Sequence, residues 1–368
     1  MKQTCYDLVF EGGGAKGSVF VGAMTAFDQK GCKPRRLVGT SAGAITATLL
    51  AAGYTPDEMR EAVNEQKSGK PRFASFMDMP KADDFDQNVI DDSDTMEIFK
   101  HVNIPFVPKI LEDKLDQKLI EALMQLPHYL QLFSFIECGG LFTGNEFLEW
   151  IKEKLADKGF DPNITLASFH AMVANELSLV TSDTDGPEML VLNHRTAPDC
   201  PVAWAVRMSM SIPFVWREVV WQKEFGLYLG KDITGHRMVD GGVLSNFPIV
   251  LVDQQPSPGS HIEKIMGNDT VAENAGTIGL LIDETIAVPG QPEKTEHSTL
   301  GGLKTVKRIS RLIDTMTGAH DNEEMQTHKA KVCRLPAQGY GTTEFDMNPD
   351  RLEALVKAGY DAMSSYLK

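Results

Sequence analysis

The chain opens with an apolar run, a glycine-rich turn and a helical pattern in direct succession. Residues 6–11 have the pattern of a short buried strand, and three consecutive glycines follow. Val19, Ala23 and Phe27 then recur every four residues, which places them on one face of a helix. Gly31 offers a C-terminal stop for that helix. The N-terminal segment is therefore predicted to form a strand, a turn and a helix.

A second unit of the same kind follows. Leu37 and Val38 are predicted to end a buried strand, and residues 42–52 to form a helix of small side chains. Residues 37–54 carry no charge and reach the length of about 18 residues that is usual for a membrane helix. Because this stretch is rich in Gly, Ala, Thr and Ser and contains a turn, we interpret it as a strand plus a buried helix.

The later part of the chain continues with short apolar runs and longer helical patterns. Two of these runs flank the acidic segment 182–186. Its acids could indicate a calcium site, but no twelve-residue ligand loop ending in Glu follows. The segment is therefore predicted to be the turn of a hairpin. Long surface loops are expected at 254–275 and 287–299. The other predicted elements are strands at 177–181, 189–192, 276–282 and 332–335, and helices at 303–329 and 349–367.

Residues 66–137 have a different character from the segments on either side. Residues 78–94 are dense in acids and predict a loop, and 112–124 have the apolar spacing of an amphipathic helix. An apolar run follows, made of Leu130, Leu132, Phe133, Phe135 and Ile136. Two interpretations stay open: a lid or acyl-chain channel over an active site, or an ordinary helical insertion packed on the sheet.

Candidate chemistry begins with the pentapeptide Gly39-Thr40-Ser41-Ala42-Gly43 between the second strand and its helix. A strand that turns sharply into a helix holds the residue at the turn in a strained, exposed position. The flanking glycines Gly39 and Gly43 avoid clashes at such a turn. Ser41 is a candidate nucleophile on this pattern, and a Gly/Ser-rich turn without chemistry is the alternative.

The turn after the first strand contains Gly12, Gly13, Gly14, Lys16 and Gly17. Consecutive glycines expose backbone amides, which can hold the oxyanion of an acyl-transfer reaction. The spacing also matches a dinucleotide fingerprint, but that site needs an acid at the end of the next strand, and none is present. No Gly-Lys-Ser/Thr sequence follows, so the turn also fails as a phosphate-binding P-loop.

A third short pattern is Asp240-Gly241-Gly242, which follows an apolar stretch. Alone it is typical of an Asp-Gly turn. The order of glycine-rich loop, Gly-x-Ser-x-Gly and Asp-Gly-Gly nevertheless resembles the patatin-like phospholipase family. Residues 208–214 resemble the small-residue segment of that family ending in Ile-Pro, and 140–147 resemble its entry into a mid-domain helix.

The resemblance implies a three-layer α/β/α fold with a central, mostly parallel sheet and a helical insertion. We expect a catalytic core over 5–252 that carries the insertion or lid at 66–137, with 253–368 completing the same domain. The implied activity is hydrolysis of lipid or phospholipid acyl esters, of the phospholipase A or lysophospholipase type, without a metal or cofactor.

The site residues implied by the resemblance form a Ser–Asp dyad, with Ser41 as nucleophile and Asp240 as base. Gly12, Gly13 and Gly14 would supply the oxyanion donors. Lys16 falls at the basic position of the family's loop, and whether it touches substrate or orders the loop stays open. The supporting motif positions are Gly17, Gly39, Gly43, Gly241 and Gly242.

A Ser-His-Asp triad is the mechanistic alternative, because it needs an imidazole near Ser41. The α/β-hydrolase order of serine, acid and histidine would admit four candidates. None of them lies at a predicted strand end with helpful glycines. These candidates are His261, His297, His320 and His328.

The net charge of the chain narrows the classes of molecule that it is expected to bind. The formal net charge of −15 disfavours nucleic acid and anionic membrane surfaces as partners, but allows transient contact with neutral lipid.

The cysteines and the N-terminal segment bear on location. Five scattered cysteines favour reduced thiols, and no signal-peptide pattern is present. A cytoplasmic location is therefore expected, with signal-less export left open. A catalytically silent sensor or scaffold and a nucleotide-binding oxidoreductase remain the alternative functions. A need for an activator or a homo-oligomer stays open.

Overall fold

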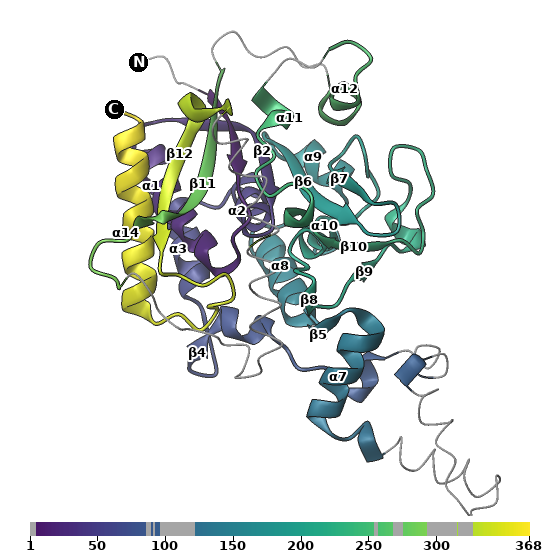
Figure 1. Ribbon diagram of the computed structural model, residues 1–368. Helices are drawn as coiled ribbons and strands as arrows, with labels where there is room; N and C mark the ends of the chain where they lie inside the picture. Colours follow the sequence, from purple (N-terminus) through teal and green to yellow (C-terminus); the bar gives the residue numbers. More distant parts are fainter. Residues whose placement is uncertain are drawn as a thin grey trace, which may run out of the picture.

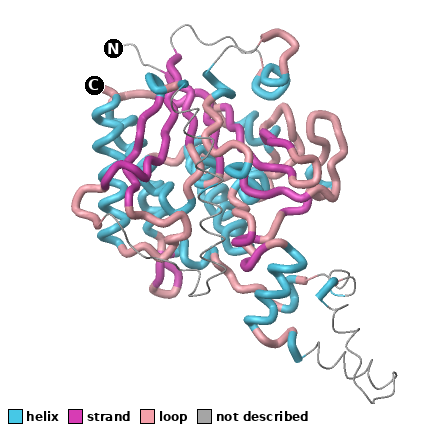
Figure 2. Tube along the Cα trace, viewed as in Figure 1, coloured by secondary structure: helices cyan, strands magenta, loops and turns pink. Residues whose placement is uncertain are grey.

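A central sheet organises the part of the chain described by the computed structural model (Figures 1 and 2). Residues 5–85, 90, 93–95, 122–253, 257–267, 275–292, 315 and 327–368 are described. Across the sheet the strands of the main path are β12 (Val332–Gln338), β11 (Ala275–Ala287), β1 (Cys5–Phe10), β2 (Lys33–Thr40), β6 (Glu176–Asp183), β10 (Arg237–Asp240) and β9 (Val219–Val220). The strand β7 (Glu188–Leu192) pairs with β6 as a hairpin.

The sheet is parallel through β12, β11, β1, β2 and β6, and antiparallel where β10, β9 and β7 join. Its register brings two strand ends together. Thr40, the last residue of β2, pairs with Val180, and Asp240, the last residue of β10, pairs with the adjacent Thr181. The residues that follow β2 and complete β10 therefore meet at one edge of the sheet, where sites form in open α/β folds.

Alternation along the strands divides the core between the two faces of the sheet. Leu8 and Phe10 of β1 point into a large apolar core, whereas Val9 lies in a smaller one on the other face. The larger core is covered by α1 (Val19–Gln29), α2 (Ala42–Ala51), α10 (Val202–Ser209) and α14 (Pro349–Tyr366). The smaller core is covered by α11 (Val250–Asp253) and α12 (His261–Met266). Helices thus flank both faces of the sheet.

The first and last helices pack closely against each other (Figure 1). A methyl group on Gly22 of α1 would lie 1.7 Å from the carbonyl oxygen of Val356 in α14. Likewise, one on Gly359 of α14 would lie 2.0 Å from the carbonyl oxygen of Val19. Only glycine allows such an approach of two backbones, so these two residues bring the C-terminal helix onto the helix that follows the glycine-rich loop.

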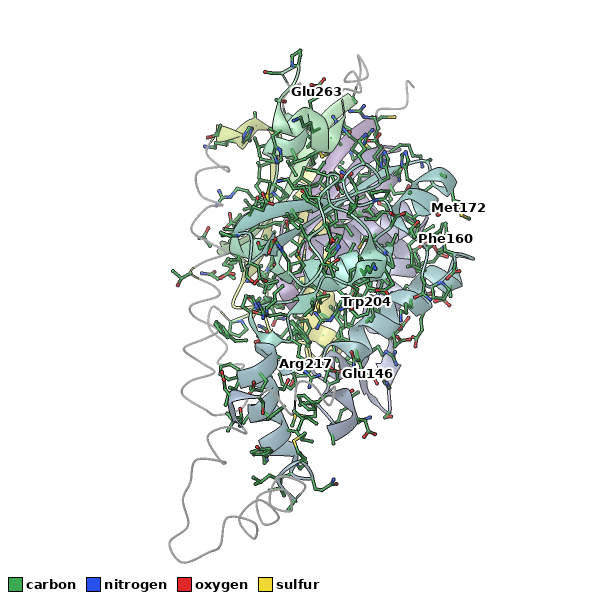
Figure 3. All side chains as sticks on the ribbon, turned by 90° about the vertical axis from the view of Figure 1, so that its right-hand side faces the viewer. Glu146, Phe160, Met172, Trp204, Arg217 and Glu263 are labelled. Carbon is green, nitrogen blue, oxygen red and sulfur yellow. The ribbon has the colours of Figure 1, made fainter. Side chains whose placement is uncertain are left out.

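An arm built around α7 (Pro127–Cys138) projects from one end of the body (Figure 1). It has a small apolar core of its own, in which Phe133 packs edge-on against Phe85 with ring centroids 5.0 Å apart. Arg217 attaches the arm to the body by donating to Ser134 Oγ at 2.8 Å and by lying over the Phe85 ring. Figure 3 shows Arg217 at the end of the body nearest the arm and Glu263 at the opposite end.

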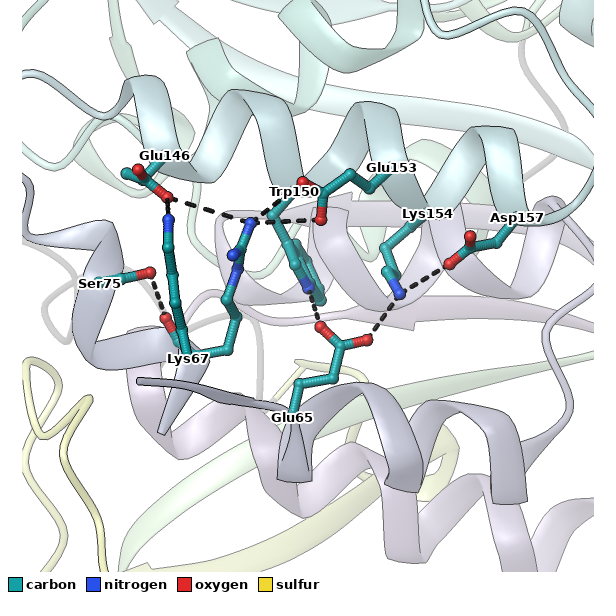
Figure 4. A network of polar contacts seen from close by, with 9 residues as sticks. Glu65, Lys67, Ser75, Glu146, Trp150, Glu153, Lys154 and Asp157 are labelled. Carbon is teal, nitrogen blue, oxygen red and sulfur yellow. Dashed lines mark hydrogen bonds and ion pairs between the residues drawn. The ribbon is translucent and has the colours of Figure 1, made fainter. Parts of the chain in front are cut away.

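The helix α8 (Asn145–Asp157) is fixed to the segment after α3 (Pro56–Asn64) by a polar network (Figure 4). Glu65 accepts hydrogen bonds from Trp150 Nε1 at 2.9 Å and from Lys154 Nζ at 2.6 Å. Arg72 reaches Glu153 at 3.2 Å. These bonds hold residues 65–72 against α8. The remaining elements are β3 (Gln66–Lys67), β4 (Lys70–Pro71), β5 (Gly140–Phe142), β8 (Phe214–Trp216), α9 (Leu166–Met172) and the 3-10 helices η1 (Gly14–Ser18), η2 (Arg72–Phe76), η3 (Ala82–Asp84), η4 (Lys223–Phe225), η5 (Gly241–Val243) and η6 (Lys329–Lys331).

The structure confirms the predicted α/β class with a mostly parallel sheet. The predicted strands and the hairpin around 182–186 are present within three residues of their expected ends, except that β11 continues five residues beyond 282. The loop expected at 254–275 contains the helix α12, which Ser260 caps by accepting from the Glu263 amide at 3.1 Å. The helices predicted at 112–124 and 303–329 lie almost entirely outside the described residues.

Candidate active site

Ser41 occupies the sharp turn between β2 and α2. Its backbone has φ 54° and ψ −120°, a conformation that is strained for any residue with a side chain. The strain agrees with the expectation for this turn, but the exposed position does not, because Ser41 is only 4% exposed. The succession of β2, a sharp turn at Ser41 and α2 is the strand–turn–helix geometry expected from the pentapeptide. A methyl group on Gly43 would lie 2.2 Å from the carbonyl oxygen of Phe10, which explains the glycine after the serine.

The end of α10 holds Ser41 in this conformation. The Ser41 amide donates to Ser209 Oγ at 3.0 Å, and Ser209 Oγ donates to the carbonyl oxygen of Val180 at 2.5 Å. Thr40 Oγ1 donates to the carbonyl oxygen of Ser245 at 3.1 Å, which ties the same turn to the segment after β10. The turn is therefore fixed from two directions by bonds that span more than a hundred residues of sequence.

The same stretch after α10 also holds Asp240. The Asp240 amide donates to the carbonyl oxygen of Ser211 at 2.8 Å, two residues beyond the serine that holds Ser41. The Ser211 hydroxyl bonds to the buried guanidinium of Arg207. Residues 209–211 therefore set the separation of the two predicted dyad residues. This gives a physical role to the small-residue segment 208–214.

The Asp240 carboxyl is buried and only partly hydrogen-bonded. Its Oδ1 accepts from the Gly242 amide at 2.8 Å, whereas Oδ2 has no partner of normal geometry among the described residues. Burial raises the pKa of Asp240 to about 7, and hydrogen bonding from the Ser41 side chain and the Gly242 amide opposes the rise. The two side chains are therefore close enough to interact, and the carboxyl has an unused acceptor atom for a proton.

The glycine-rich loop lies beside Ser41. A methyl group on Gly12 would lie 3.1 Å from Ser41 Cβ and 2.2 Å from Asn246 Oδ1, so a larger residue there would displace the Asn246 side chain. The Gly12 amide donates to the carbonyl oxygen of Asn246 at 3.1 Å and is therefore already engaged. The amides of Gly13 and Gly14 donate no hydrogen bond within the described part of the chain. Of the three expected oxyanion donors, these two are the ones left for a ligand.

Lys16 is buried and turns away from bulk solvent to form an ion pair with Glu284 of β11. This contact fits the loop-ordering alternative for Lys16. Of the other motif positions, Gly17 closely approaches Ala42, Gly39 approaches the backbone of Gly43, and Gly241 approaches the carbonyl oxygen of Val180. The expected motif residues therefore converge on one place.

A family model for patatin-like phospholipases matches residues 8–253. The chain belongs to the patatin-like phospholipase family. This result agrees with the resemblance drawn from the order of the three motifs. Ser41, Asp240 and the glycine-rich loop all lie within the matched residues, whereas β11, β12 and α14 lie beyond them.

Two related proteins share about a quarter of their aligned residues with this chain. The chain is 27% identical over 369 residues to the uncharacterized protein YqhO of Bacillus subtilis, covering 98% of both chains. It is 24% identical over 250 residues to the uncharacterized protein R571 of Acanthamoeba polyphaga mimivirus, covering 67% of this chain and 61% of that one.

Two solved structures also match at low similarity. VipD from Legionella pneumophila matches with a TM-score of 0.46 at 16% identity, over 98% of this chain and 66% of VipD. The type III effector ExoU matches with a TM-score of 0.43 at 16% identity, over all of this chain and 53% of ExoU. The chain thus spans about two thirds of VipD and about half of ExoU.

The histidines of the described residues lie apart from the Ser41 and Asp240 side chains in hydrogen bonding. No histidine in the described ranges hydrogen-bonds to Ser41 or Asp240. His261 begins α12 and His328 precedes η6, whereas His297 and His320 lie outside the described residues. In the described part of the chain, no group of three or more metal-binding side chains is found, and no helix is long and apolar enough to span a bilayer.

Sequence reasoning missed two polar residues that support the glycine-rich loop. Glu11 is 4% exposed and accepts hydrogen bonds from the Ile282 amide and from Asn246 Nδ2. Asn246 Nδ2 also donates to the carbonyl oxygen of Gly12 at 3.2 Å. A single acid at the end of a buried strand was a usable signal for Glu11. The pairing with Asn246 has no local signal, because the two residues are far apart in the chain.

Proposed function

We propose that this protein is a serine lipid acyl hydrolase in which Ser41 is the nucleophile and Asp240 the general base. The observation that carries the proposal is the buried Asp240 carboxyl, with a pKa near 7, beside a serine in a strained turn. A general base is most effective when its pKa lies near the working pH. The lack of a hydrogen bond from any described histidine to either side chain supports Asp240 as the group that takes the serine proton.

The proposed reaction has two halves. Asp240 accepts the Ser41 proton as Oγ attacks the ester carbonyl, and the Gly13 and Gly14 amides stabilise the oxyanion. The ester C–O bond then breaks, and protonated Asp240 returns the proton to the leaving alcohol. Asp240 then deprotonates a water molecule that attacks the acyl-serine carbonyl. The bond from the acyl carbon to Ser41 Oγ breaks, protonated Asp240 returns the proton to Oγ, and the fatty acid leaves. Each oxyanion donor would stabilise the transition state by about 3–4 kcal/mol.

The decisive experiment compares the parent protein with Ser41→Ala. A fluorophosphonate probe should label the parent at Ser41, and the variant should remain unlabelled with an unchanged circular dichroism spectrum. Mass spectrometry of phosphatidylcholine vesicles should detect released fatty acid only with the parent. A folded parent that neither takes the probe nor releases fatty acid would support a silent scaffold instead.

We further propose that the arm contacts the lipid surface. The apolar run of α7 is divided by the helix: Leu130 and Phe133 are buried in the arm, whereas Leu132 and Ile136 are 53% and 50% exposed. Leu132 and Ile136 are four residues apart and therefore share one face of the helix. Exposed apolar side chains on a projecting element fit a neutral lipid surface, which the net charge of −15 also favours over an anionic one.

Replacing Leu132 and Ile136 together with Ser should test this contact. Hydrolysis of phosphatidylcholine vesicles should fall about tenfold, because replacing two half-exposed apolar side chains weakens membrane binding by about 1–2 kcal/mol. Hydrolysis of a short soluble ester should stay within about twofold. Met172→Ser is the matched control, because Met172 is 63% exposed on the body (Figure 3). Equal losses on both substrates would contradict surface contact.

A further inference from the structure

The loop between β12 and α14 lies directly on the glycine-rich loop, although it is outside the residues matched by the family model. The Ala15 amide donates to the carbonyl oxygen of Thr342 at 2.9 Å. A methyl group on Gly14 would lie 2.1 Å from that same oxygen, and Gly14 has φ 55°. The backbone around Thr342 is therefore the surface against which Gly14 and Ala15 are set.

A buried ion pair fixes this C-terminal loop. Glu344 and Arg351 are 3% and 5% exposed, and Arg351 Nε donates to Glu344 Oε1 at 2.6 Å. A second bond joins Arg351 Nη2 to Glu344 Oε2 at 3.1 Å, and the same carboxylate oxygen accepts from the Gly341 amide at 3.1 Å. The bidentate geometry fixes distance and orientation together, which a single contact would not do.

Tyr340 completes the clamp, by which we mean Tyr340, Glu344 and Arg351. Its hydroxyl donates to the carbonyl oxygen of Arg351 at 2.9 Å, and the guanidinium lies 3.9 Å from the centre of its ring. On the other side of the loop, the ring of Phe345 packs edge-on against Trp216 of β8 at 5.4 Å. Thr342 is thus held between two anchored positions.

A buried ion pair is weak evidence for stability, because desolvation of two charges offsets much of their attraction. We attribute to this ion pair a role in fixing the conformation of the loop, and not mainly in stabilising the fold. The loop contacts Ala15 and Gly14, and Gly14 carries one of the two amides that donate no hydrogen bond within the described residues. A displacement on the order of 1 Å at such a place can reduce a rate about 100-fold.

We propose that the clamp is a positioning element for the oxyanion hole, acting through Thr342 and Ala15 to aim the Gly13 and Gly14 amides. This inference rests on the proposed hydrolase function. Because the oxyanion exists only after attack on the carbonyl, misaligned donors lower kcat and leave substrate binding nearly unchanged. The clamp residues touch no reacting atom, and their effect passes entirely through the loop backbone.

The test compares Glu344→Gln with Asp7→Asn, a buried acid at the other end of the sheet, on a short soluble ester below the unfolding range of both. Glu344→Gln should lower kcat about 10–100-fold with KM within about twofold, and slow fluorophosphonate labelling of Ser41 in proportion. Asp7→Asn should keep kcat within about twofold. Tyr340→Phe, which removes only one hydrogen bond, provides a milder variant with a smaller loss in the same direction.

Amide hydrogen exchange provides a readout that does not need turnover. Exchange over residues 12–17 should be faster in Glu344→Gln than in the parent, and unchanged in Asp7→Asn. Glu344→Gln and Tyr340→Phe variants with parental kcat and parental exchange at this loop would overturn the positioning role. A parent without ester hydrolysis would refute the proposed function alone, because the exchange comparison would still decide whether the clamp orders the loop.

Discussion

Two buried aspartates at opposite ends of the sheet have opposite surroundings. Asp7, on β1, receives bonds from both Arg35 and Arg36, including Arg35 Nη2 at 2.6 Å and Arg36 Nη2 at 2.8 Å. Asp240, at the end of β10, receives the Gly242 amide on Oδ1 and faces the Ser41 hydroxyl, with no cationic side chain among its described partners. Both are almost fully buried, at 2% and 4% exposure.

The difference separates a structural carboxylate from one suited to proton transfer. Arg35 and Arg36 donate to both carboxylate oxygens of Asp7, so two positive charges compensate its burial. Asp240 is desolvated without a compensating charge, which raises its pKa to about 7. The fold therefore tolerates an unpaired buried acid at the place where chemistry is proposed, and pairs the acid where only strand packing is required.

The largest effect is expected from Asp240→Asn on catalysis. An amide cannot accept the Ser41 proton, so kcat on a soluble ester should fall by about 10²–10⁴-fold, the usual contribution of general-base catalysis. Single substitutions of the four triad candidates by Gln should leave kcat within a fewfold. These controls are His261, His297, His320 and His328. Loss of activity at one histidine with an intact fold would replace the dyad with a triad.

Asp7→Ala should have little direct effect on the chemistry but a large effect on stability. It leaves the buried Arg36 guanidinium, which is 6% exposed, without its partner. Breaking such a buried pair costs about 3–5 kcal/mol of unfolding free energy, measured by urea denaturation. The control is Glu353→Ala, which removes an exposed pair with Arg60 and should cost less than about 1 kcal/mol. Equal costs would show that burial does not distinguish the two pairs.

Asp240→Asn should also stabilise the protein at alkaline pH. The folded-state pKa of about 7 exceeds the ordinary value of 3.8, so the folded state binds more protons than the unfolded state between these limits. Stability from this group is therefore lost as pH rises from about 4 to about 7. At pH 8 the variant should gain about 1–3 kcal/mol over the parent, with the gain vanishing near pH 4. A pH-independent difference would refute the raised pKa.

The smallest effect is the pH dependence of the parent's own activity. Because Asp240 must be ionised to accept a proton, kcat/KM should rise tenfold per pH unit below about 7 and level off above it. The measurement is kcat/KM on a soluble ester from pH 5 to 9, with folding verified at each pH. A flat profile down to pH 5 would mean that the base has an ordinary carboxyl pKa.

Much of the local structure was predictable from the sequence. The strand patterns, the turn at Ser41 and the hairpin at 182–186 follow from periodicity and turn residues, which act over a few neighbours. The family motifs then pointed to Ser41 and Asp240 as a pair. Their order along the chain carries this information even though each motif alone is weak.

Tertiary structure decided what surrounds those residues. The bonds of Ser41 to Ser209 and of Asp240 to Ser211, and the contact of Gly14 with Thr342, depend on which strands become neighbours in the sheet. The division of the α7 run into buried Phe133 and exposed Leu132 likewise depends on what packs beside the helix. Sequence pattern specifies local conformation, whereas burial and long-range hydrogen bonds arise only when distant segments meet, and these set the pKa of Asp240.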